Sequence, residues 1–320
     1  MTKNIDVSIV VISFNTKDIT IDCLKSVVNF TKDVNYELIV VDNASTDGSD
    51  KAIEEFSKKH KNTIFVKKKN NLGFGGGNNV GMERAKGRYI LLLNSDTKLH
   101  EDSISAMVEW MDANSDAGVA TCQLKNIDKS IQATGGKFPT LLRVVGWSLF
   151  LDDIPMWSRL FGSYHPHTHS SAVGDDYYRK SHVQDWITGA FMMIKQEAYE
   201  SVGGFDSKFF MYTEDVEYSY RFRRQGWKIW YVPITSILHI GGASSSGAGV
   251  EFSDKVIGKE SSVVGEFVGL KLFYKKHFPG QYGLARIIMK TGAILRIFVF
   301  GFLQGQSEAR KIYAKAFQSI

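Results

Sequence analysis

The sequence predicts an α/β fold with a largely parallel central sheet that helices cover on both faces. Over the first hundred residues, short continuous apolar runs alternate with segments in which apolar residues recur at helical spacing. Such apolar runs indicate strands buried on both faces, and the intervening helices supply the cover. The 320 residues, of which 43% are hydrophobic and 23% charged, suffice for one large domain or two ordinary ones.

The elements of this sheet are expected in strict alternation. The predicted strands are Val7–Ile12, Glu37–Val41, Ile64–Lys67 and Arg88–Leu93. The predicted helices between them are Ile19–Phe30, Ser49–His60 and Asn78–Ala85. Further along, Asp215–Gln225 has helical spacing and is followed by Gly226, a residue typical of helix ends, and Ile229–Val232 is predicted as a strand.

Residues 138–185 break this alternation. The segment is rich in Gly, Ser, His and aromatic residues and shows no regular period. We therefore expect a long irregular excursion from the sheet. Its aromatic residues are Trp147, Phe150, Trp157, Phe161 and Tyr164.

The two cysteines limit the chemistry and the compartment. Cys23 and Cys122 are too few for a disulfide framework or a four-thiolate zinc site. We expect both to be small buried apolar side chains in a cytoplasmic protein. The first residues also lack the apolar stretch and small-residue cleavage site of a signal peptide.

The positive charge is concentrated at the C-terminus. Residues 251–320 carry 11 Lys and Arg against 5 Asp and Glu, a net charge of +6, whereas the whole chain has +5. Because the rest of the chain is not basic, nucleic acid is not an expected partner. The same tail holds an apolar segment, Leu284–Leu303, that is interrupted by Lys290 and Arg296.

Two interpretations of this tail are open. No uninterrupted stretch reaches the ~20 apolar residues that a spanning helix needs. A basic, strongly apolar helix is expected to lie on an anionic membrane surface, where Arg286, Lys290 and Arg296 meet lipid head groups. The alternative is a C-terminal helix that packs on the body of the protein and leaves a basic face exposed.

Polar residues follow the ends of three predicted strands, where ligands bind in parallel sheets. Asp42 can accept the N–H of a pyrimidine base, or it can simply be a turn residue. Asp96 can hold a divalent cation that bridges two phosphates, or it can belong to a capping turn. The residues in question are Ser13, Asn15, Asp42, Asn94, Ser95 and Asp96.

A glycine-rich segment, Asn71–Asn79, follows the third predicted strand. It lacks the Gly-Lys-Ser/Thr of a phosphate-binding loop, and Asn78 stands where a dinucleotide fingerprint has its third glycine. Its flanking asparagines favour a loop that faces a ligand over a flexible connector. The glycines would let the backbone approach that ligand closely.

Two further positions carry candidate chemistry. Asp215, beside Glu214 at the start of a predicted helix, is a candidate general base, although carboxylates also favour helix N-termini on electrostatic grounds alone. His239 follows an apolar run and is either a metal ligand or a histidine at the edge of the core. The alternating set His165, His167 and His169 lies in the irregular segment, and we do not expect it to bind zinc.

Taken in order, these motifs resemble inverting glycosyltransferases of family 2, in the rhamnosyltransferase-like branch. The resemblance extends over about residues 5–245. Its motifs are Val10–Asn15, Val40–Ser45, Asn71–Gly75, Leu92–Asp96, Gly203–Asp206 and Glu214–Glu217 with Arg221. It implies the GT-A fold, a Rossmann-like, mostly parallel sheet covered by helices, over residues 1–245. The basic, apolar residues 246–320 would then form a helical C-terminal extension.

The resemblance also implies roles for individual residues. Asp215 would be the catalytic base with Glu214 as its acidic neighbour, and Asp96 with His239 would bind Mg²⁺ or Mn²⁺. Asn94 stands where the family's metal motif has its first aspartate. The nucleotide-sugar would contact Ser13, Asn15, Asp42, Asn71, Gly73, Asn78, Asn94, Ser95 and Asp96. The acceptor side would be shaped by Trp186, Thr188 and Gly189.

These roles describe an enzyme that transfers a sugar with inversion from a nucleotide-sugar to a glycan hydroxyl. The resemblance implies dTDP-L-rhamnose as donor, with UDP-sugars as the alternative. It further implies a lipid-linked acceptor in surface polysaccharide synthesis, which matches a peripheral position on the inner face of the cell membrane. Two other classes are considered: a dinucleotide-dependent enzyme and a catalytically inactive sugar-binding or scaffold protein.

Overall fold

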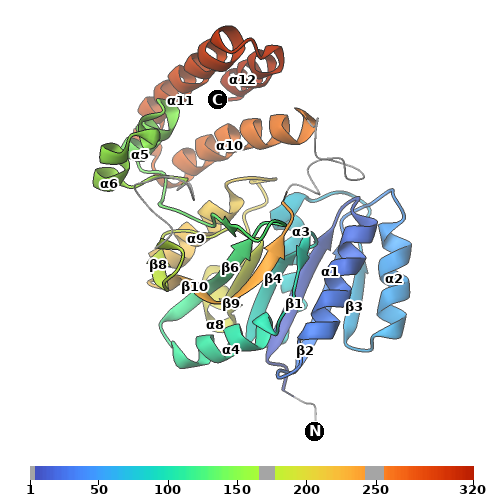
Figure 1. Ribbon diagram of the computed structural model, residues 1–320. Helices are drawn as coiled ribbons and strands as arrows, with labels where there is room; N and C mark the ends of the chain where they lie inside the picture. The colour runs from blue at the N-terminus through green and yellow to red at the C-terminus, as the bar shows by residue number, and fades with distance from the viewer. Residues whose placement is uncertain (1–3, 166–176, 242–255) are drawn as a thin grey trace.

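The predicted α/β architecture is confirmed in the computed structural model, which describes residues 4–165, 177–241 and 256–320. Within these residues, strands form one mixed sheet in the order β3-β2-β1-β4-β9-β6-β10-β5, with β7 and β8 paired to β6 and β10 (Figure 1). The strands are β1 (Val7–Ser13), β2 (Tyr36–Asp42), β3 (Thr63–Lys67), β4 (Tyr89–Asn94), β5 (Thr97–Lys98), β6 (Ala117–Lys125), β7 (Ile131–Gln132), β8 (His182–Gln184), β9 (Phe191–Lys195) and β10 (Lys228–His239).

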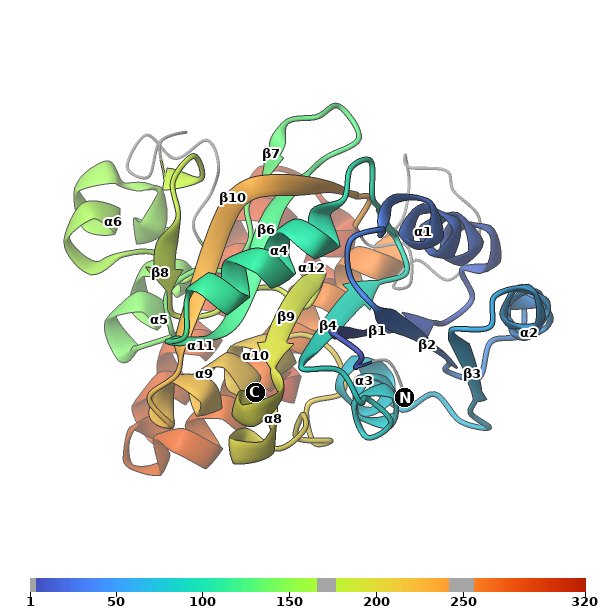
Figure 2. The ribbon, with the colours of Figure 1, turned by 90° about the horizontal axis from the view of Figure 1, so that it is seen from below.

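Helices cover both faces of this sheet, as Figure 2 shows. On one face lie α1 (Lys17–Phe30), α2 (Ser49–Lys59) and α4 (Ser103–Ala113), and on the other lie α3 (Gly73–Met82), α8 (Gln196–Val202) and α9 (Glu214–Arg224). Because side chains alternate along a strand, neighbouring residues of one strand pack against helices on opposite faces of the sheet. Val11 of β1 belongs to the core cluster under α1 and α4, whereas its neighbour Val10 belongs to the cluster under α3 and α9.

The first half of the sheet is parallel and the second half is mixed, because β6 and β10 are parallel whereas β9 is not. Strands β3, β2, β1 and β4 run parallel, while β9 is antiparallel to both of its neighbours, β4 and β6. The parallel edge aligns the ends of β1, β2 and β4, because Ser13 pairs with Asp42 and Ile12 with Asn94. The polar residues predicted to follow these strands are therefore brought to one edge.

Two predicted elements differ from the structure. The helix expected at Asn78–Ala85 is α3, which begins at Gly73, so most of the glycine-rich segment is helical rather than a loop. The Gly73 N–H donates to Asn71 Oδ1 at 2.8 Å and the Phe74 N–H donates to the Phe210 carbonyl at 2.9 Å. These contacts satisfy first-turn N–H groups and outweigh the low helix propensity of glycine.

The predicted strand Ile229–Val232 is only the first part of β10. The pairing of β10 with β6 shifts register between Val232 and Ser236, and the interruption contains Pro233, which has no N–H to donate. After this irregularity the strand continues to His239. The longer strand carries His239 to the same edge of the sheet as Asn94, where β10 pairs with β5.

Residues 138–185 are more regular than predicted. They contain α5 (Leu141–Ser148), the 3₁₀ turn Leu151–Asp153, α6 (Pro155–Phe161) and β8. His167 and His169 lie outside the described residues. The aromatic side chains that made the segment look irregular pack on other helices. Trp147 and Tyr164, for example, both contact the helical layer formed by the C-terminus.

That layer consists of α10 (Val256–His277), a 3₁₀ turn (Pro279–Gln281), α11 (Tyr282–Arg296), a π-helical continuation (Ile297–Leu303) and α12 (Ser307–Ser319). Figure 1 shows it next to α5 and α6. It has an apolar core of its own, which includes Phe267, Phe273 and Met289. The tail thus packs on the body, as the second interpretation held.

Arg296 corrects one expectation for the tail. It was expected to meet lipid head groups, but only 6% of its surface is exposed. Its guanidinium donates to the Ser148 carbonyl at 2.7 Å and to the Trp147 carbonyl at 2.5 Å, and it stacks on the Trp147 ring. The carbonyl groups at the end of α5, which need donors, hold this arginine inside.

The outer face of α11 and its π-helical continuation is an apolar stripe. Its members are three, four or seven residues apart, which places them on one side of the helix, and each has more than half of its surface exposed: Leu284, Ile287, Ile294, Phe298 and Phe302. The inner face, with Ala285, Met289 and Ala293, is buried. In the part of the chain that the structure describes, no helix is long and apolar enough to cross a membrane.

Candidate active site

A cavity of about 500 Å³ lies beyond the carboxyl ends of β1, β2 and β4. This is the position at which ligands enter doubly covered α/β sheets. Its walls come from the strand ends, from the start of α3, from the turn before α9 and from α10. The predicted site residues that line it are Asn71, Gly73, Asn78, Asn94, Ser95, Asp96, Trp186, Thr188, Gly189, Glu214, Asp215 and His239.

The carboxyl groups of Glu214 and Asp215 lie at the start of α9, directly after an unusual turn. Tyr212 and Thr213 both have positive φ angles, 68° and 67°. Non-glycine residues rarely adopt this conformation, and two in succession indicate a backbone held by its surroundings. The turn presents the half-buried Asp215 side chain to the cavity and buries Glu214 beside it.

Burial changes the proton affinity of both carboxyl groups. It raises the pKa of Asp215 to about 7, and the charge of Glu266 acts in the same direction, although the Val216 N–H donates to Asp215 Oδ1 at 2.8 Å. Burial also raises the pKa of Glu214, whose Oε2 has no hydrogen-bond partner among the described residues. A carboxyl with a pKa near 7 is suited to accept a proton in neutral solution.

Asp96 and His239 face each other at the opposite wall. Their Oδ1 and Nε2 atoms are 3.3 Å apart, and His239 Nδ1 donates to Gln132 Oε1 at 2.6 Å. This hydrogen bond orients the imidazole so that Nε2 faces Asp96. A carboxylate and an oriented imidazole are a donor set that fits a divalent cation such as Mn²⁺.

These two residues do not form a complete metal site by themselves. Among the described residues, no cluster joins three or more His, Cys, Asp or Glu side chains that could hold a metal ion. The Asn94 amide lies 3.4 Å from His239 Nε2, at the position where a second carboxylate was expected from the family pattern. A bound cation would need further oxygen ligands from a substrate.

Three of the predicted nucleotide-binding residues are not among the residues that line this cavity. Ser13 is buried and its hydroxyl pairs with Thr20 at 3.0 Å. Asn15 Oδ1 accepts the Thr46 N–H at 2.7 Å, which ties the loops after β1 and β2 together. Asp42 accepts the Ser45 N–H, and its buried Oδ1 has no partner among the described residues, a costly state that a ligand N–H would relieve.

The predicted acceptor-side residues lie together at another wall. The Thr188 hydroxyl is paired with that of Thr134 at 2.8 Å. The Trp186 indole N–H donates to the Lys137 carbonyl at 3.1 Å, so its ring is fixed. Both contacts join this wall to the segment that follows β7.

Several residues that line the cavity or contact its lining were not predicted from the sequence. Asn43 links Asn71 to the Gly73 carbonyl through its side-chain amide, and its position next to Asp42 was the available signal. Nothing in the sequence pointed to Gln132, because its role depends on its hydrogen bond with His239. Tyr164 and His165 lie in the segment taken to be irregular, and Glu266 lies in the C-terminal extension.

The comparisons with known proteins agree with this geometry. The sequence profile of glycosyl transferase family 2 matches residues 8–217. The chain therefore belongs to the family 2 glycosyltransferases, which replaces the dinucleotide-dependent alternative. The profile ends within α9, so α10 and Glu266 lie outside the matched range.

Relatives and a solved structure give more detail. The chain is 26% identical over 219 residues to N-acetylglucosaminyl-diphospho-decaprenol L-rhamnosyltransferase of Mycobacterium tuberculosis, covering 63% of this chain and 66% of that protein. It is 25% identical over 175 residues to rhamnosyltransferase WbbL of Escherichia coli, covering 52% and 60%. The chain thus spans less than two thirds of either relative.

The fold is shared with a mannosyltransferase of Pyrobaculum calidifontis, solved with GDP-Man and Mn²⁺. The TM-score is 0.55 at 16% identity, and the match covers 99% of this chain and 86% of that one. The identity is low, so this likeness concerns the fold alone. It supports the GT-A architecture.

The buried Glu214 carboxyl leads to a prediction about stability. Its folded-state pKa is raised, so the folded protein binds more protons than the unfolded one, and this group costs stability as pH rises above 4.5. Glu214→Gln should therefore raise the free energy of unfolding at pH 8 but not at pH 4. The gain should be about 1 kcal/mol or more, since one pKa unit equals about 1.4 kcal/mol.

Urea denaturation at pH 4 and pH 8 measures this difference. Glu54→Gln, which removes an exposed carboxylate on α2, is the matched control and should give no such gain. An equal effect of Glu214→Gln at both pH values would show that Glu214 is not a buried, proton-binding carboxyl.

Proposed function

We propose that the protein is a metal-dependent, inverting glycosyltransferase that moves a sugar from a nucleotide-sugar to a hydroxyl of a glycan acceptor. One observation supports this most directly: a single cavity holds a carboxyl with a raised pKa, Asp215, and facing Asp96 and His239 side chains. A direct displacement requires these two functions, a base for the attacking hydroxyl and a positive charge for the leaving diphosphate.

In this mechanism Asp215 accepts the proton of the acceptor hydroxyl as the oxygen attacks the anomeric carbon. The neighbouring buried Glu214 disfavours additional negative charge and so favours proton uptake by the pair. Asp96 and His239 would hold the divalent cation, and Gln132 fixes the imidazole of His239. When bound, Mg²⁺ or Mn²⁺ would supply charge stabilisation for the departing nucleoside diphosphate. The sugar is inverted because no covalent intermediate is formed.

The proposed donor is dTDP-L-rhamnose. The support is the agreement between the sequence motifs and two relatives whose names state rhamnosyl transfer. In the donor site, the unpaired Oδ1 of Asp42 is a candidate acceptor for the ring N–H of thymine, which uracil also presents. UDP-sugars are consequently the second candidate donors, and both nucleotides satisfy the same carboxylate.

The proposed acceptor is a lipid-linked glycan in surface polysaccharide synthesis. The name of the mycobacterial relative includes a diphospho-decaprenol. The apolar stripe on α11 and its π-helical continuation (Leu284, Ile287, Ile294, Phe298 and Phe302) offers a surface that can insert into the interface of the cytoplasmic membrane, where such an acceptor lies.

The charges next to the stripe favour an anionic membrane. The neighbouring charges of Lys275, Arg286 and Lys290, acting with burial, lower the pKa of Lys271, so these four residues form one basic cluster. Lys271 and Arg286 also bind carbonyl oxygens at the end of α12, which keeps the cluster beside α11. Each basic residue near an anionic surface contributes about 1 kcal/mol to binding.

The Asp215→Asn variant should still bind the nucleotide-sugar donor but lose turnover. Removal of a general base costs ~10²–10⁴-fold in rate, while the contacts of the donor are unchanged. In the wild-type enzyme, activity should rise with pH through about 7, because Asp215 must be deprotonated to act. Thermal stabilisation by dTDP-L-rhamnose and UDP-sugars measures binding, and donor turnover is followed by release of the nucleoside diphosphate.

Asp22→Asn is a suitable control, since Asp22 is an exposed carboxylate on α1, away from the cavity lining. Near-normal turnover by folded Asp215→Asn would exclude Asp215 as the base. Stabilisation of the wild-type protein without any turnover would favour the inactive sugar-binding alternative.

Asp96→Ala should abolish the effect of Mn²⁺ on affinity for the nucleoside diphosphate. Gln132→Leu should weaken that effect about 10–100-fold, because the imidazole of His239 loses the partner that orients it. Calorimetry with dTDP and UDP, with and without Mn²⁺, measures both. Asp128→Ala, which removes an exposed carboxylate from the turn before β7, should have no effect. A full Mn²⁺ effect in Asp96→Ala would mean that another residue holds the cation.

Ile287→Ser with Phe298→Ser should weaken binding to anionic vesicles by at least about tenfold. Burial of one large apolar side chain contributes about 1.5–3 kcal/mol. Because both side chains are exposed, the melting temperature should stay nearly unchanged, which a deletion of the tail would not allow. Wild-type binding should also fall as salt rises.

Co-sedimentation with vesicles containing anionic lipid is the measurement. Ile64→Ser with Ile127→Ser, two exposed apolar residues on other parts of the body, is the matched pair. Equal binding by both double variants, or no binding by the wild-type protein at low salt, would leave the stripe without a membrane role.

A further inference from the structure

Helix α10 packs unusually closely against the turn that precedes the catalytic carboxyls. Its residues Gly265 and Gly269, one helical turn apart, face Tyr212 and Thr213. A Cβ atom on Gly265 would lie 2.6 Å from Tyr212 Cδ2, and one on Gly269 would overlap the Thr213 side chain. Only glycine permits this approach, so α10 supports the two residues whose positive φ angles set up α9.

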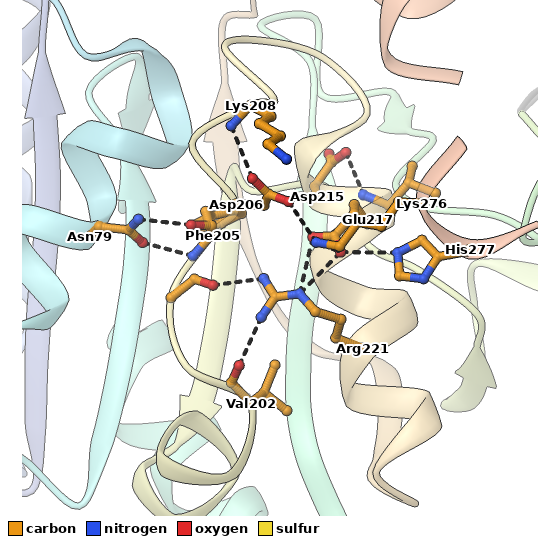
Figure 3. Close-up of polar contacts among 12 residues, drawn as sticks. Asn79, Val202, Phe205, Asp206, Lys208, Asp215, Glu217, Arg221, Lys276 and His277 are labelled. Atoms are coloured by element: carbon orange, nitrogen blue, oxygen red, sulfur yellow. Dashed lines mark hydrogen bonds and ion pairs between the residues drawn. The ribbon is translucent and has the colours of Figure 1, made fainter. Parts of the chain in front are cut away.

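The C-terminal end of α10 is fixed to α9 by charges (Figure 3). Glu217 is fully buried, and its carboxylate lies 3.0 Å from His277 Nε2 and 2.9 Å from Lys276 Nζ. Arg221 completes the set at 3.0 Å. Although burial acts in the opposite direction, these partners lower the pKa of Glu217. Both ends of the contact between α9 and α10 are therefore fixed.

Between the two glycines of the first contact, α10 contributes Glu266 to the cavity that contains Asp215. Glu266 Oε1 accepts the Tyr164 hydroxyl at 2.5 Å and faces His165 Nε2 at 3.3 Å. The His165 ring rests edge-on against Trp186, at 5.4 Å between centroids. Glu266 and His165 thus form an ion pair in the same cavity as the catalytic base.

We propose that Glu266 and His165 are positioning residues for Asp215, which set the charge around its carboxylate and so the pH range in which it accepts a proton. The inference rests on the proposed function of Asp215 and extends it to two residues outside the predicted set. It assigns to α10, which lies beyond the family match, a share in the reaction.

The titratable side chains that face Asp215 come from three segments. Glu214 lies on the same helix, Glu266 on α10, and Tyr164 and His165 on the segment after α6. Glu266 raises the pKa of Asp215, whereas His165 lowers it. The pair is also mutually dependent: burial lowers the pKa of His165, but Glu266, together with the charges of Asp215 and Asp152, outweighs burial and raises it.

The opposite effects of Glu266 and His165 on the pKa of Asp215 define the variants to compare. His165→Asn removes the positive charge and leaves Glu266 next to Asp215, so the titration midpoint of Asp215 should rise on the order of one pH unit. Adding Glu266→Gln to His165→Asn removes the remaining negative charge, and the midpoint should fall back by a similar amount. Glu266→Gln alone is less informative, because His165 then loses its proton more readily.

The midpoint can be measured without any substrate, from the carboxyl ¹³C resonances of aspartate-labelled protein. The resonance of Asp215 is identified by its loss in Asp215→Asn. Tyr164→Phe, which removes a hydrogen bond but no charge, should leave the midpoint near its wild-type value. His60→Asn, a histidine stacked on Phe56 in α2, controls for the substitution itself. The acidic limb of the rate profile should move with the midpoint.

An Asp215 midpoint that stays at the wild-type value in both His165→Asn and the double variant would overturn the proposal. So would a midpoint that moves while the rate profile does not. If no nucleotide-sugar is turned over by any of the proteins, the proposed function fails, and the NMR titration still decides whether the pair acts on Asp215.

Discussion

The contact between α10 and the turn Tyr212–Thr213 is the constraint on which the candidate site depends. Two successive non-glycine residues with positive φ cost on the order of 1–3 kcal/mol each, and the surrounding structure has to supply that energy. The glycines of α10 allow the close packing that holds the turn, and the charge network around Glu217 holds the helix. The start of α9, and with it Asp215, is fixed as a result.

The carboxyl groups of α9 illustrate how one helix can serve two purposes. Glu217 is buried with Arg221, Lys276 and His277 around it, and it is stabilised as an anion that joins two helices. Glu214 and Asp215 lie three and two residues earlier without comparable compensation, and their pKa values are raised. The positively charged side chains surround Glu217, the carboxylate that joins the two helices, and the other two carboxyl groups keep a high proton affinity.

The C-terminal helices connect this chemistry to a surface. The inner faces of α10 and α11 pack on α5 and on the residues around the cavity, and Arg296 secures the packing through backbone carbonyls. The outer face of α11 keeps its apolar stripe exposed. A single helical layer can therefore support the acceptor side of the cavity and, in the proposed function, bring that cavity to the membrane that holds the acceptor.

The sequence by itself determined the alternation of strands and helices, the polar strand ends and the candidate roles of Asp96, Asp215 and His239. These depend on local periodicity and on residue type, which are visible in one dimension. It did not determine that the glycine-rich segment begins α3, because contacts with Asn71 and Phe210 decide this. Nor did it identify His165 and Glu266 as cavity residues or Gln132 as the partner of His239, since each acquires its role from a partner distant in the chain. The tertiary structure alone decided which face of the tail is buried: both faces of α11 are apolar, and packing against α5, α10 and α12 distinguishes them.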